Sequence, residues 1–143
     1  MYKRKPRKPK PPFKSIFEET VAENLELTEL YEKSKVSYRV PETHHKYTPD
    51  FYINEYLVIE TKGKFTSQDR YKMACVKEQY PKINFVLYFQ NANVPIRKGS
   101  MTKYWTWAEK NGFTWYCSKT KPLTPRELTK LIKESLDANQ QDN

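Results

Sequence analysis

The sequence predicts one mixed α/β domain in which helices flank a mixed β-sheet. Segments rich in β-branched and aromatic residues are interspersed with segments of helical periodicity, in the order α-β-β-β-α-β-α-β-α. With 143 residues, the chain is also long enough to bury one hydrophobic core. We therefore expect a disordered basic arm at 1–14, a single folded domain at 15–136 and a polar tail at 137–143.

The first half of the folded domain should contain one helix and three strands. Ser15 and Glu18 have the spacing of a capping box, and apolar residues follow them at helical intervals. Pro41 and Pro49 enclose a polar stretch that should be extended. The expected elements are a helix over 15–35, a strand over 36–40, a polar connector over 41–47, and two strands over 48–53 and 57–62.

The second half should alternate between helices and strands. Ser67 is the expected N-cap of its first helix, and Asn111-Gly112 is a typical C-terminal signal for its second. Tyr104, Trp105 and Trp107 on that second helix are interpreted as core residues rather than a base-stacking platform. The expected elements are helices over 67–80, 101–110 and 123–136, strands over 83–89 and 113–117, and a loop over 90–100.

The net charge of +9 is concentrated at the N-terminus. The arm has no acidic residue and is interrupted by prolines, so it has little to bury and should bind phosphate backbones without reading sequence. A solubilising or targeting tail is the alternative. Later basic residues could line a DNA channel or be ordinary solvated charges. The candidate DNA contacts are Lys3, Arg4, Lys5, Arg7, Lys8, Lys10 and Lys14 in the arm, and Lys64, Arg70, Lys72, Arg97 and Lys98 beyond it.

Composition also argues against several classes of protein. With only 3 glycines, the chain lacks a glycine-rich phosphate loop, and no stretch approaches the roughly 20 apolar residues of a membrane span. The N-terminus does not resemble a signal peptide, so a cytoplasmic protein with no membrane partner is expected. Cys75 and Cys117 are then expected to be reduced core thiols, a disulfide or catalytic cysteine being less favoured.

Asp50 and the run from Glu60 to Lys62, separated by nine residues, form the pattern most indicative of chemistry. Glu60 and Lys62 project from one face of a strand because they are two residues apart. If residues 54–56 form a three-residue hairpin loop, Asp50 falls opposite Glu60, with Cβ atoms about 5 Å apart. A two-residue loop would set Asp50 against Ile59 and turn Glu60 away, so the pattern requires the longer loop.

Two facing carboxylates repel each other, and a hard divalent cation such as Mg²⁺ or Mn²⁺ would resolve that conflict. Lys62 beside them would orient a water or stabilise a crowded phosphate. The alternative is a solvent-exposed face of unrelated charges. Glu18 is equally open: as the third residue of a capping box it satisfies a helix end, but it could also reach a second metal ion.

Three runs of residues resemble the phage endonuclease I family, Holliday junction resolvases of the PD-(D/E)XK nuclease superfamily. The similarity extends from Phe13 to the end of the strand at 113–117. The runs that carry it are Phe13-Lys14-Ser15 with Glu18, Tyr47-Thr48-Pro49-Asp50-Phe51, and Glu60-Thr61-Lys62-Gly63.

This resemblance implies a restriction-endonuclease-like core and specific roles for the site residues. Asp50, Glu60 and the backbone carbonyl of Thr61 would bind one metal ion, Glu18 would bind a second, and Lys62 would be catalytic. It also implies an intertwined, domain-swapped homodimer in which the connector at 41–47 crosses between two lobes, so that Glu18 serves the neighbouring chain's site. A phage protein of this kind would act in the cytoplasm of the bacterial host.

The expected function is therefore metal-dependent resolution of four-way DNA junctions by paired nicks, with no small-molecule substrate. Another PD-(D/E)XK nuclease, acting on mismatches or on specific sequences, is the first alternative. A non-catalytic DNA-binding module that uses the arm and the aromatic residues is the second, and a structural phage protein with a cationic tail is the third.

Overall fold

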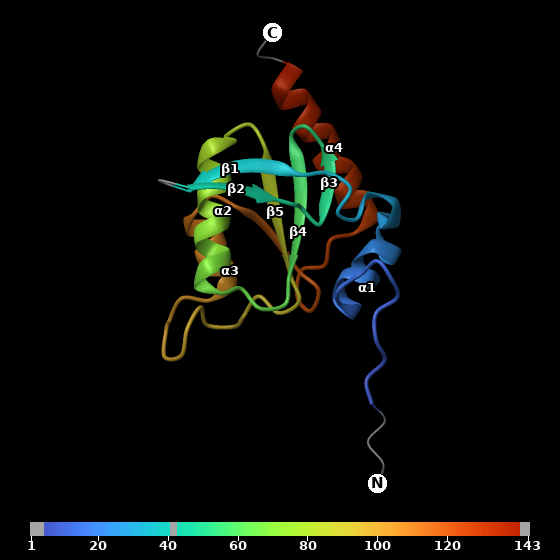
Figure 1. Ribbon diagram of the computed structural model, residues 1–143, viewed down its shortest axis with the longest axis vertical. Helices are drawn as coiled ribbons and strands as arrows, with labels where there is room; N and C mark the ends of the chain where they lie inside the picture. The colour runs from blue at the N-terminus through green and yellow to red at the C-terminus, as the bar shows by residue number, and fades with distance from the viewer. Residues whose placement is uncertain (1–4, 41–42, 141–143) are drawn as a thin grey trace.

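The computed structural model, which describes residues 5–40 and 43–140, confirms the mixed α/β class (Figure 1). Its central sheet has the strand order β3-β4-β5-β6. β3 (Phe51–Asn54) is antiparallel to β4 (Leu57–Lys62), whereas β5 (Asn84–Phe89) and β6 (Thr114–Cys117) continue parallel to β4. The sheet is therefore mixed, as the sequence predicts.

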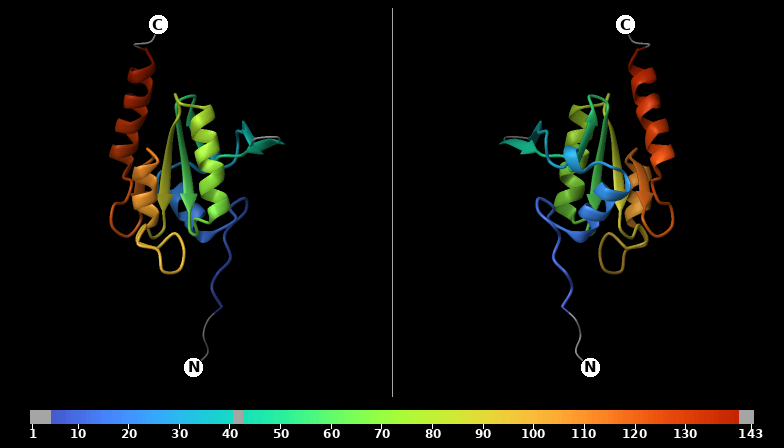
Figure 2. Two further views of the ribbon diagram at one scale, coloured as in Figure 1. Left: turned by 90° about the vertical axis from the view of Figure 1, so that its left-hand side faces the viewer. Right: turned by 90° about the vertical axis from the view of Figure 1, so that its right-hand side faces the viewer.

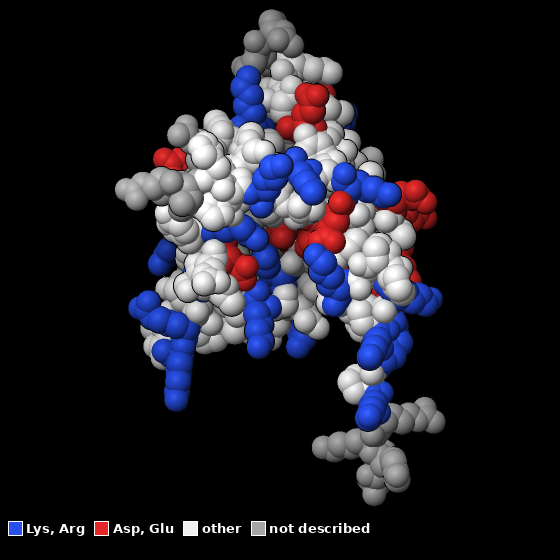
Figure 3. Space-filling view, in the orientation of Figure 1, with Lys and Arg blue, Asp and Glu red and all other residues white. Residues whose placement is uncertain are grey.

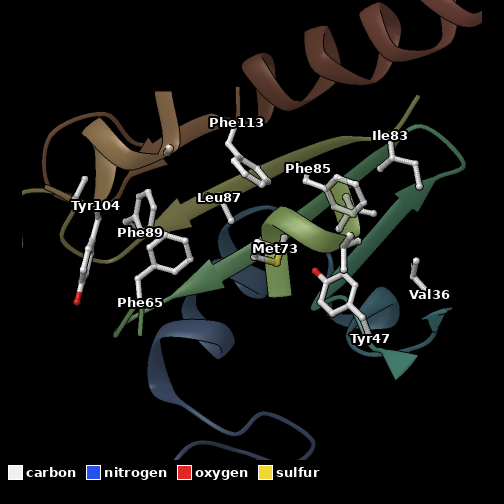
Figure 4. Close-up of a cluster of buried hydrophobic side chains, with 14 of the residues drawn as sticks. Val36, Tyr47, Phe65, Met73, Ile83, Phe85, Leu87, Phe89, Tyr104 and Phe113 are labelled. Atoms are coloured by element: carbon white, nitrogen blue, oxygen red, sulfur yellow. The ribbon is translucent and has the colours of Figure 1, made fainter. Parts of the chain in front are cut away.

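Helices cover both faces of this sheet (Figure 2). α2 (Ser67–Gln79) and α3 (Tyr104–Lys110) pack on one face, and α1 (Ile16–Asn24) and α4 (Pro125–Gln140) pack on the other. Alternate residues of β4 serve the two cores: Val58 faces α2, while Leu57 and Ile59 face α1 and α4. Figure 4 shows the first core, in which Phe65, Met73, Phe85, Leu87 and Phe89 pack together.

The first helix is shorter than the predicted 15–35. The N-cap is confirmed, since the Ser15 hydroxyl accepts a hydrogen bond from the amide of Glu18, but α1 ends at Asn24. Glu26 adopts a left-handed conformation with φ 57°, and the amide of Leu27 bonds back to the carbonyl of Ala22 at 2.8 Å. This is a Schellman termination without its usual glycine, so the sequence carried no signal for it. A short 3₁₀ helix, η1 (Thr28–Leu30), follows.

The predicted connector is wrong for residues 43–47, which form strand β2 (Thr43–Tyr47). This strand pairs with β1 (Val36–Val40) in a separate antiparallel hairpin, which packs against α2. Cross-strand contacts explain the folding: the ring of His45 stacks on Tyr38 with centroids 5.6 Å apart, and Tyr47 is buried beside α2. Residues 41 and 42 lie outside the described residues. The exchange of segments between two chains stays a prediction.

The predicted three-residue loop between β3 and β4 is also wrong. Asn54 pairs with Leu57, which leaves two residues in the turn, and a bulge between Tyr52 and Asn54 then shifts the register by one residue. Phe51 consequently pairs with Ile59. The bulge thus restores the register that the longer loop would have given, and Asp50 comes to lie beside Glu60.

The remaining differences concern the ends of elements. The N-cap of α2 is Thr66 rather than Ser67, in a full capping box with Asp69. α3 begins at Tyr104, not at 101, and ends at Asn111-Gly112 as predicted, with Gly112 at φ 76°. α4 continues to Gln140, so most of the predicted polar tail is helical, and 141–143 lie outside the described residues. No helix in the described part of the chain is long and apolar enough to cross a membrane.

Candidate active site

The predicted site residues meet at the end of β4 that lies on the side of the molecule from which the arm extends (Figure 1). Asp50 immediately precedes β3, and Glu60, Thr61 and Lys62 are the last residues of β4. Asp50 and Glu60 are buried, with 7% and 4% of their surfaces exposed. Figure 3 shows acidic side chains gathered at the centre of this face, with lysines and arginines around them.

Asp50 is fixed by Thr61. The amide and the hydroxyl of Thr61 both donate hydrogen bonds to Oδ2 of Asp50, at 2.9 and 2.6 Å. Burial raises the pKa of Asp50; the bonds from Thr61 oppose that shift, and the charge of Glu18 adds to it. Both hydrogen bonds from Thr61 fall on the same oxygen, which fixes the orientation of the carboxylate.

Glu60 is held by groups from three directions. Its Oε2 accepts hydrogen bonds from the Tyr47 hydroxyl and from the amide of Asp50, and its Oε1 lies 3.7 Å from Nζ of Lys62. Burial, together with the nearby charge of Asp50, raises the pKa of Glu60 to about 7. A further positive charge at this position would lower both pKa values and favour the ionised carboxylates.

Lys62 is fixed between two carboxylates. Its ammonium lies 3.7 Å from Oε1 of Glu60 and 3.4 Å from Oδ1 of Asp69 on α2, and its side chain is only 12% exposed. Asp69 also accepts bonds from Thr66 at the start of α2, so the helix end sets the position of the carboxylate that faces Lys62. The lysine is thus a point charge with a defined position.

Glu18 takes part in the cap of α1, one of the two roles that the sequence left open, and its binding of a second metal ion stays a prediction. Ser15 caps α1 and donates its hydroxyl to Oε2 of Glu18 at 2.6 Å, while the Tyr31 hydroxyl donates to Oε1 at 2.7 Å. The charge of Glu18 also contributes to the raised pKa of Asp50, so the two carboxylates are close enough to repel each other. One chain therefore brings Glu18 near Asp50.

The donor set fits a hard divalent cation. All the side-chain donors are carboxylate oxygens, and the two buried carboxylates carry raised pKa values that a cation would lower. Within residues 5–40 and 43–140, no three His, Cys, Asp or Glu side chains are grouped closely enough to form a complete metal cage. An ion here would complete its coordination with backbone oxygen and water, as Mg²⁺ commonly does.

The candidate DNA contacts have different surroundings. Lys64, Arg97 and Lys98 are exposed, and Lys72 lies with its Nζ 5.3 Å from the centre of the Tyr47 ring. Arg70 instead donates to the carbonyls of Phe65 and Ile96, at 2.7 and 3.2 Å. Lys3 and Arg4 lie outside the described residues. The other arm candidates, all exposed, are Lys5, Arg7, Lys8, Lys10 and Lys14.

The aromatic residues of α3 belong to the core, as interpreted from the sequence. Tyr104 is buried, and Trp107 stacks on Phe113 with ring centroids 5.5 Å apart. Trp105 is partly buried against the same cluster and donates its indole N–H to Asn93. Cys75 and Cys117 are both free thiols, and Cys117 is buried.

Sequence reasoning missed three residues that support the site: Tyr31, Tyr47 and Asp69. Thr66-Ser67-Gln68-Asp69 carries a capping-box signal that could have identified Asp69 as the acid nearest Lys62. Tyr47 is the first residue of the run Tyr47-Thr48-Pro49-Asp50-Phe51 that carries the family resemblance. Its bond to Glu60, however, depends on the position of strand β2. Nothing in the sequence around Tyr31 indicates its bond to Glu18.

Two buried carboxylates beside a fixed lysine, at the end of an inner strand of a mixed α/β sheet, are the kind of groups that phosphate-ester chemistry requires. A family model for phage endonuclease I matches residues 1–140. Endodeoxyribonuclease 1 of Enterobacteria phage T3 is 39% identical over 103 residues, which cover 70% of this chain and 68% of the relative. Endonuclease I of Escherichia phage T7 is 37% identical over 103 residues, covering 70% and 69%. The chain belongs to the phage endonuclease I family.

Proposed function

We propose that the chain is a metal-dependent DNA endonuclease that resolves four-way (Holliday) junctions by paired nicks. As a member of its family it is a deoxyribonuclease, and the names of the phage T3 and T7 relatives agree. The observation that carries the proposed metal dependence is the buried pair of Asp50 and Glu60, both with raised pKa values, with Glu60 3.7 Å from Nζ of Lys62. Such a pair is costly to ionise unless it binds a cation.

Asp50, Glu60 and the backbone carbonyl of Thr61 would hold one Mg²⁺ or Mn²⁺ ion, and Glu18 would contribute to a second. When bound, such ions lower the pKa of water and neutralise charge on a phosphate. Thr61 has a double role in this proposal, because its amide and hydroxyl already orient Asp50. That arrangement is the kind of outer support that metal-binding carboxylates require.

The lysine would act directly on the phosphate. Lys62 is held by Glu60 and Asp69, so its ammonium can face a scissile phosphodiester without searching for a conformation. Its charge would offset the negative charge that builds up on the phosphate oxygens during attack. The exposed basic residues would bind flanking phosphates, with the arm on one side and Arg97 and Lys98 on the other.

Action on branched DNA with paired nicks would require two active sites at a fixed separation. An intertwined homodimer supplies this arrangement, and a restriction-endonuclease-like core is consistent with the mixed sheet observed here. The β1–β2 hairpin contains the predicted connector and would be the segment that crosses between the two chains in such a dimer, because it lies between α1 and β3 in the sequence.

The proposal is tested by cleavage of a synthetic four-way junction in Mg²⁺, compared with the same sequences as plain duplex and as mismatched duplex. Wild type should cut the junction fastest, and Asp50→Asn should bind it without cutting. A cruciform plasmid should pass to linear product without accumulating the nicked form if nicks are paired. Equal cleavage of plain duplex would refute the proposed preference for junctions. Cleavage in EDTA would refute the proposed metal dependence.

A mismatch-specific or sequence-specific nuclease is the second candidate, since the same catalytic groups would serve it. It predicts that mismatched or specific duplexes are cut faster than the junction. A non-catalytic binding module predicts no difference between wild type and Asp50→Asn in any assay, which family membership already disfavours.

A further inference from the structure

Glu19 is a buried carboxylate that the proposed chemistry does not use. It follows Glu18 on α1 but is only 1% exposed. Its Oε2 accepts hydrogen bonds from Nη1 of Arg7 and from the amide of Lys10, both at 3.0 Å. These bonds lower the pKa of Glu19 and keep it ionised. The N-terminal arm therefore helps to bury this carboxylate.

The described part of the arm is attached at a second point. The ring of Phe13 is buried against Tyr31, with centroids 4.6 Å apart, and its amide bonds to the carbonyl of Lys10 at 3.0 Å. Between the two attachments lie Pro11 and Pro12, whose rings fix φ and stiffen the chain. The segment from Arg7 to Phe13 thus has a defined path although it forms no helix or strand.

The same path leads into the active site. The amide of Lys14 donates to the Tyr31 hydroxyl at 3.4 Å, and that hydroxyl donates to Glu18. Nζ of Lys14 is held by Glu32 at 2.7 Å. A connected series of bonds therefore runs from the arm to the carboxylate of Glu18, and Figure 1 shows the arm leaving the molecule beside α1.

We propose that Glu19 is a latch that holds the basic arm as a preformed ridge for the phosphate backbone of DNA next to the active site. The arm's remaining cations, Lys5, Lys8 and Lys10, would then contact one duplex arm of the substrate without first having to be ordered. Preorganisation of this kind increases affinity by reducing the entropy lost on binding. The inference rests on the proposed function for its substrate, whereas the latch itself is testable without DNA.

The charge of Glu19 makes the test decisive. Glu19→Gln removes a negative charge, so electrostatics alone predicts tighter DNA binding. The latch predicts the opposite, because the freed arm must be ordered again. Glu23→Gln is the matched control: the exposed Glu23 also attracts Arg7 through its charge, so this variant makes the same charge change beside the arm and tests whether the hydrogen bonds of Glu19, rather than charge alone, hold it.

The first experiment measures the arm directly, in the absence of DNA. Trypsin can cut between Arg7 and Lys8, and mass spectrometry reports the rate of that cut. We expect Glu19→Gln to be cut about tenfold faster than wild type, and Glu23→Gln to match wild type. Equal rates in all three proteins would overturn the latch. A thermal melt of each variant confirms that α1 remains folded.

The second experiment measures binding of a labelled four-way junction in EDTA as a function of salt. We expect Glu19→Gln to bind about threefold to tenfold more weakly than wild type, and Glu23→Gln to bind as tightly or slightly more tightly. Tighter binding by Glu19→Gln would contradict the proposal.

A substitution of Arg7 in the arm tests the same contact without changing a buried residue of α1. Arg7→Ala should lose more affinity than Lys5→Ala, although each loses one charge, and it should add little to Glu19→Gln in the double variant. Additive losses would show that Arg7 acts as a simple phosphate contact and overturn the latch. If no DNA is cleaved in Mg²⁺ but the arm is released by Glu19→Gln, the proposed function fails and the latch stands.

Discussion

The hydroxyl of Tyr47 donates a hydrogen bond to Oε2 of Glu60, and this bond joins the β1–β2 hairpin to the carboxylate pair. Tyr47 is fully enclosed beside α2, and burial raises its pKa well above the ordinary value, so it remains a neutral donor. The position of the hairpin therefore sets the orientation of a proposed metal ligand.

Tyr47→Phe should weaken metal binding. Without the donor, the Glu60 carboxylate loses a bond that favours its ionised form, so a higher Mg²⁺ concentration should be needed for half-maximal cleavage, by about tenfold. The maximal rate should fall much less. Titration of cleavage with Mg²⁺ at pH 7 measures both quantities. Tyr38→Phe on the same hairpin is the control, and an unchanged Mg²⁺ requirement in Tyr47→Phe would refute the role of the bond.

The stability of the metal-free protein should depend on pH through Glu60. Folding raises its pKa from 4.5 to about 7, so the folded state is favoured below pH 4.5 and this advantage is lost as the pH rises through about 7. The loss in unfolding free energy should reach about 3 kcal/mol. Chemical denaturation in EDTA at pH 5 and pH 8 measures it.

Glu60→Gln is the matching variant for this prediction. It should remove the part of the pH dependence that comes from Glu60, leave the smaller part from Asp50, whose pKa burial also raises, and make the metal-free protein more stable at pH 8 than wild type. Mg²⁺ should stabilise wild type at pH 8 and should have little effect on Glu60→Gln. Parallel pH curves for the two proteins would show that Glu60 is not the titrating group.

The sequence predicted best where local signals agree with the tertiary structure. The strand at 57–62 has the bounds of β4, because a run of β-formers ends at Gly63. The neighbourhood of Asp50 and Glu60 was also predicted, although through the wrong loop, because the bulge between Tyr52 and Asn54 offsets the shorter turn and restores the register that places both side chains on one face. The alternation of side chains along a strand specifies which face a residue occupies more strongly than it specifies the length of the turn.

What the sequence could not predict depends on residues far apart in the chain. The Tyr47–Glu60 bond requires β2 to fold back on β1, and the polar run of β2 resembles a connector. The end of α1 depends on Glu26 in a left-handed conformation, where a glycine would have been recognised. The bonds from Arg7 and Lys10 to Glu19 give the arm a path that its composition does not indicate.

Asp69 should act as a positioning residue for Lys62. Asp69→Asn keeps a side-chain acceptor for the start of α2 but loses the charge that faces the ammonium at 3.4 Å. The cleavage rate at saturating Mg²⁺ should fall by about tenfold with little change in DNA binding. Single-turnover cleavage and binding in EDTA separate the two effects.

Thr66→Ala separates this role from helix capping. It removes the hydroxyl that caps α2 and that also bonds to Asp69, but it leaves the amide bond to Asp69 and the charge that faces Lys62, so it should cost about 1 kcal/mol of stability and slow cleavage much less than Asp69→Asn. If Thr66→Ala slows cleavage as much as Asp69→Asn, the effect of Asp69 is structural.

Arg70 should stabilise the loop between β5 and α3 rather than bind DNA. Its guanidinium donates to the carbonyls of Phe65 and Ile96, so it connects the residue that precedes Thr66 with the loop that carries Arg97 and Lys98. Arg70→Ala leaves those carbonyls without this donor and should cost about 1–3 kcal/mol of unfolding free energy. Lys98→Ala, which changes an exposed side chain, should leave stability unchanged and weaken DNA binding with a smaller salt dependence. Chemical denaturation and salt-dependent binding of both variants decide the matter: a stable Arg70→Ala protein with a reduced salt slope would make Arg70 a phosphate contact instead.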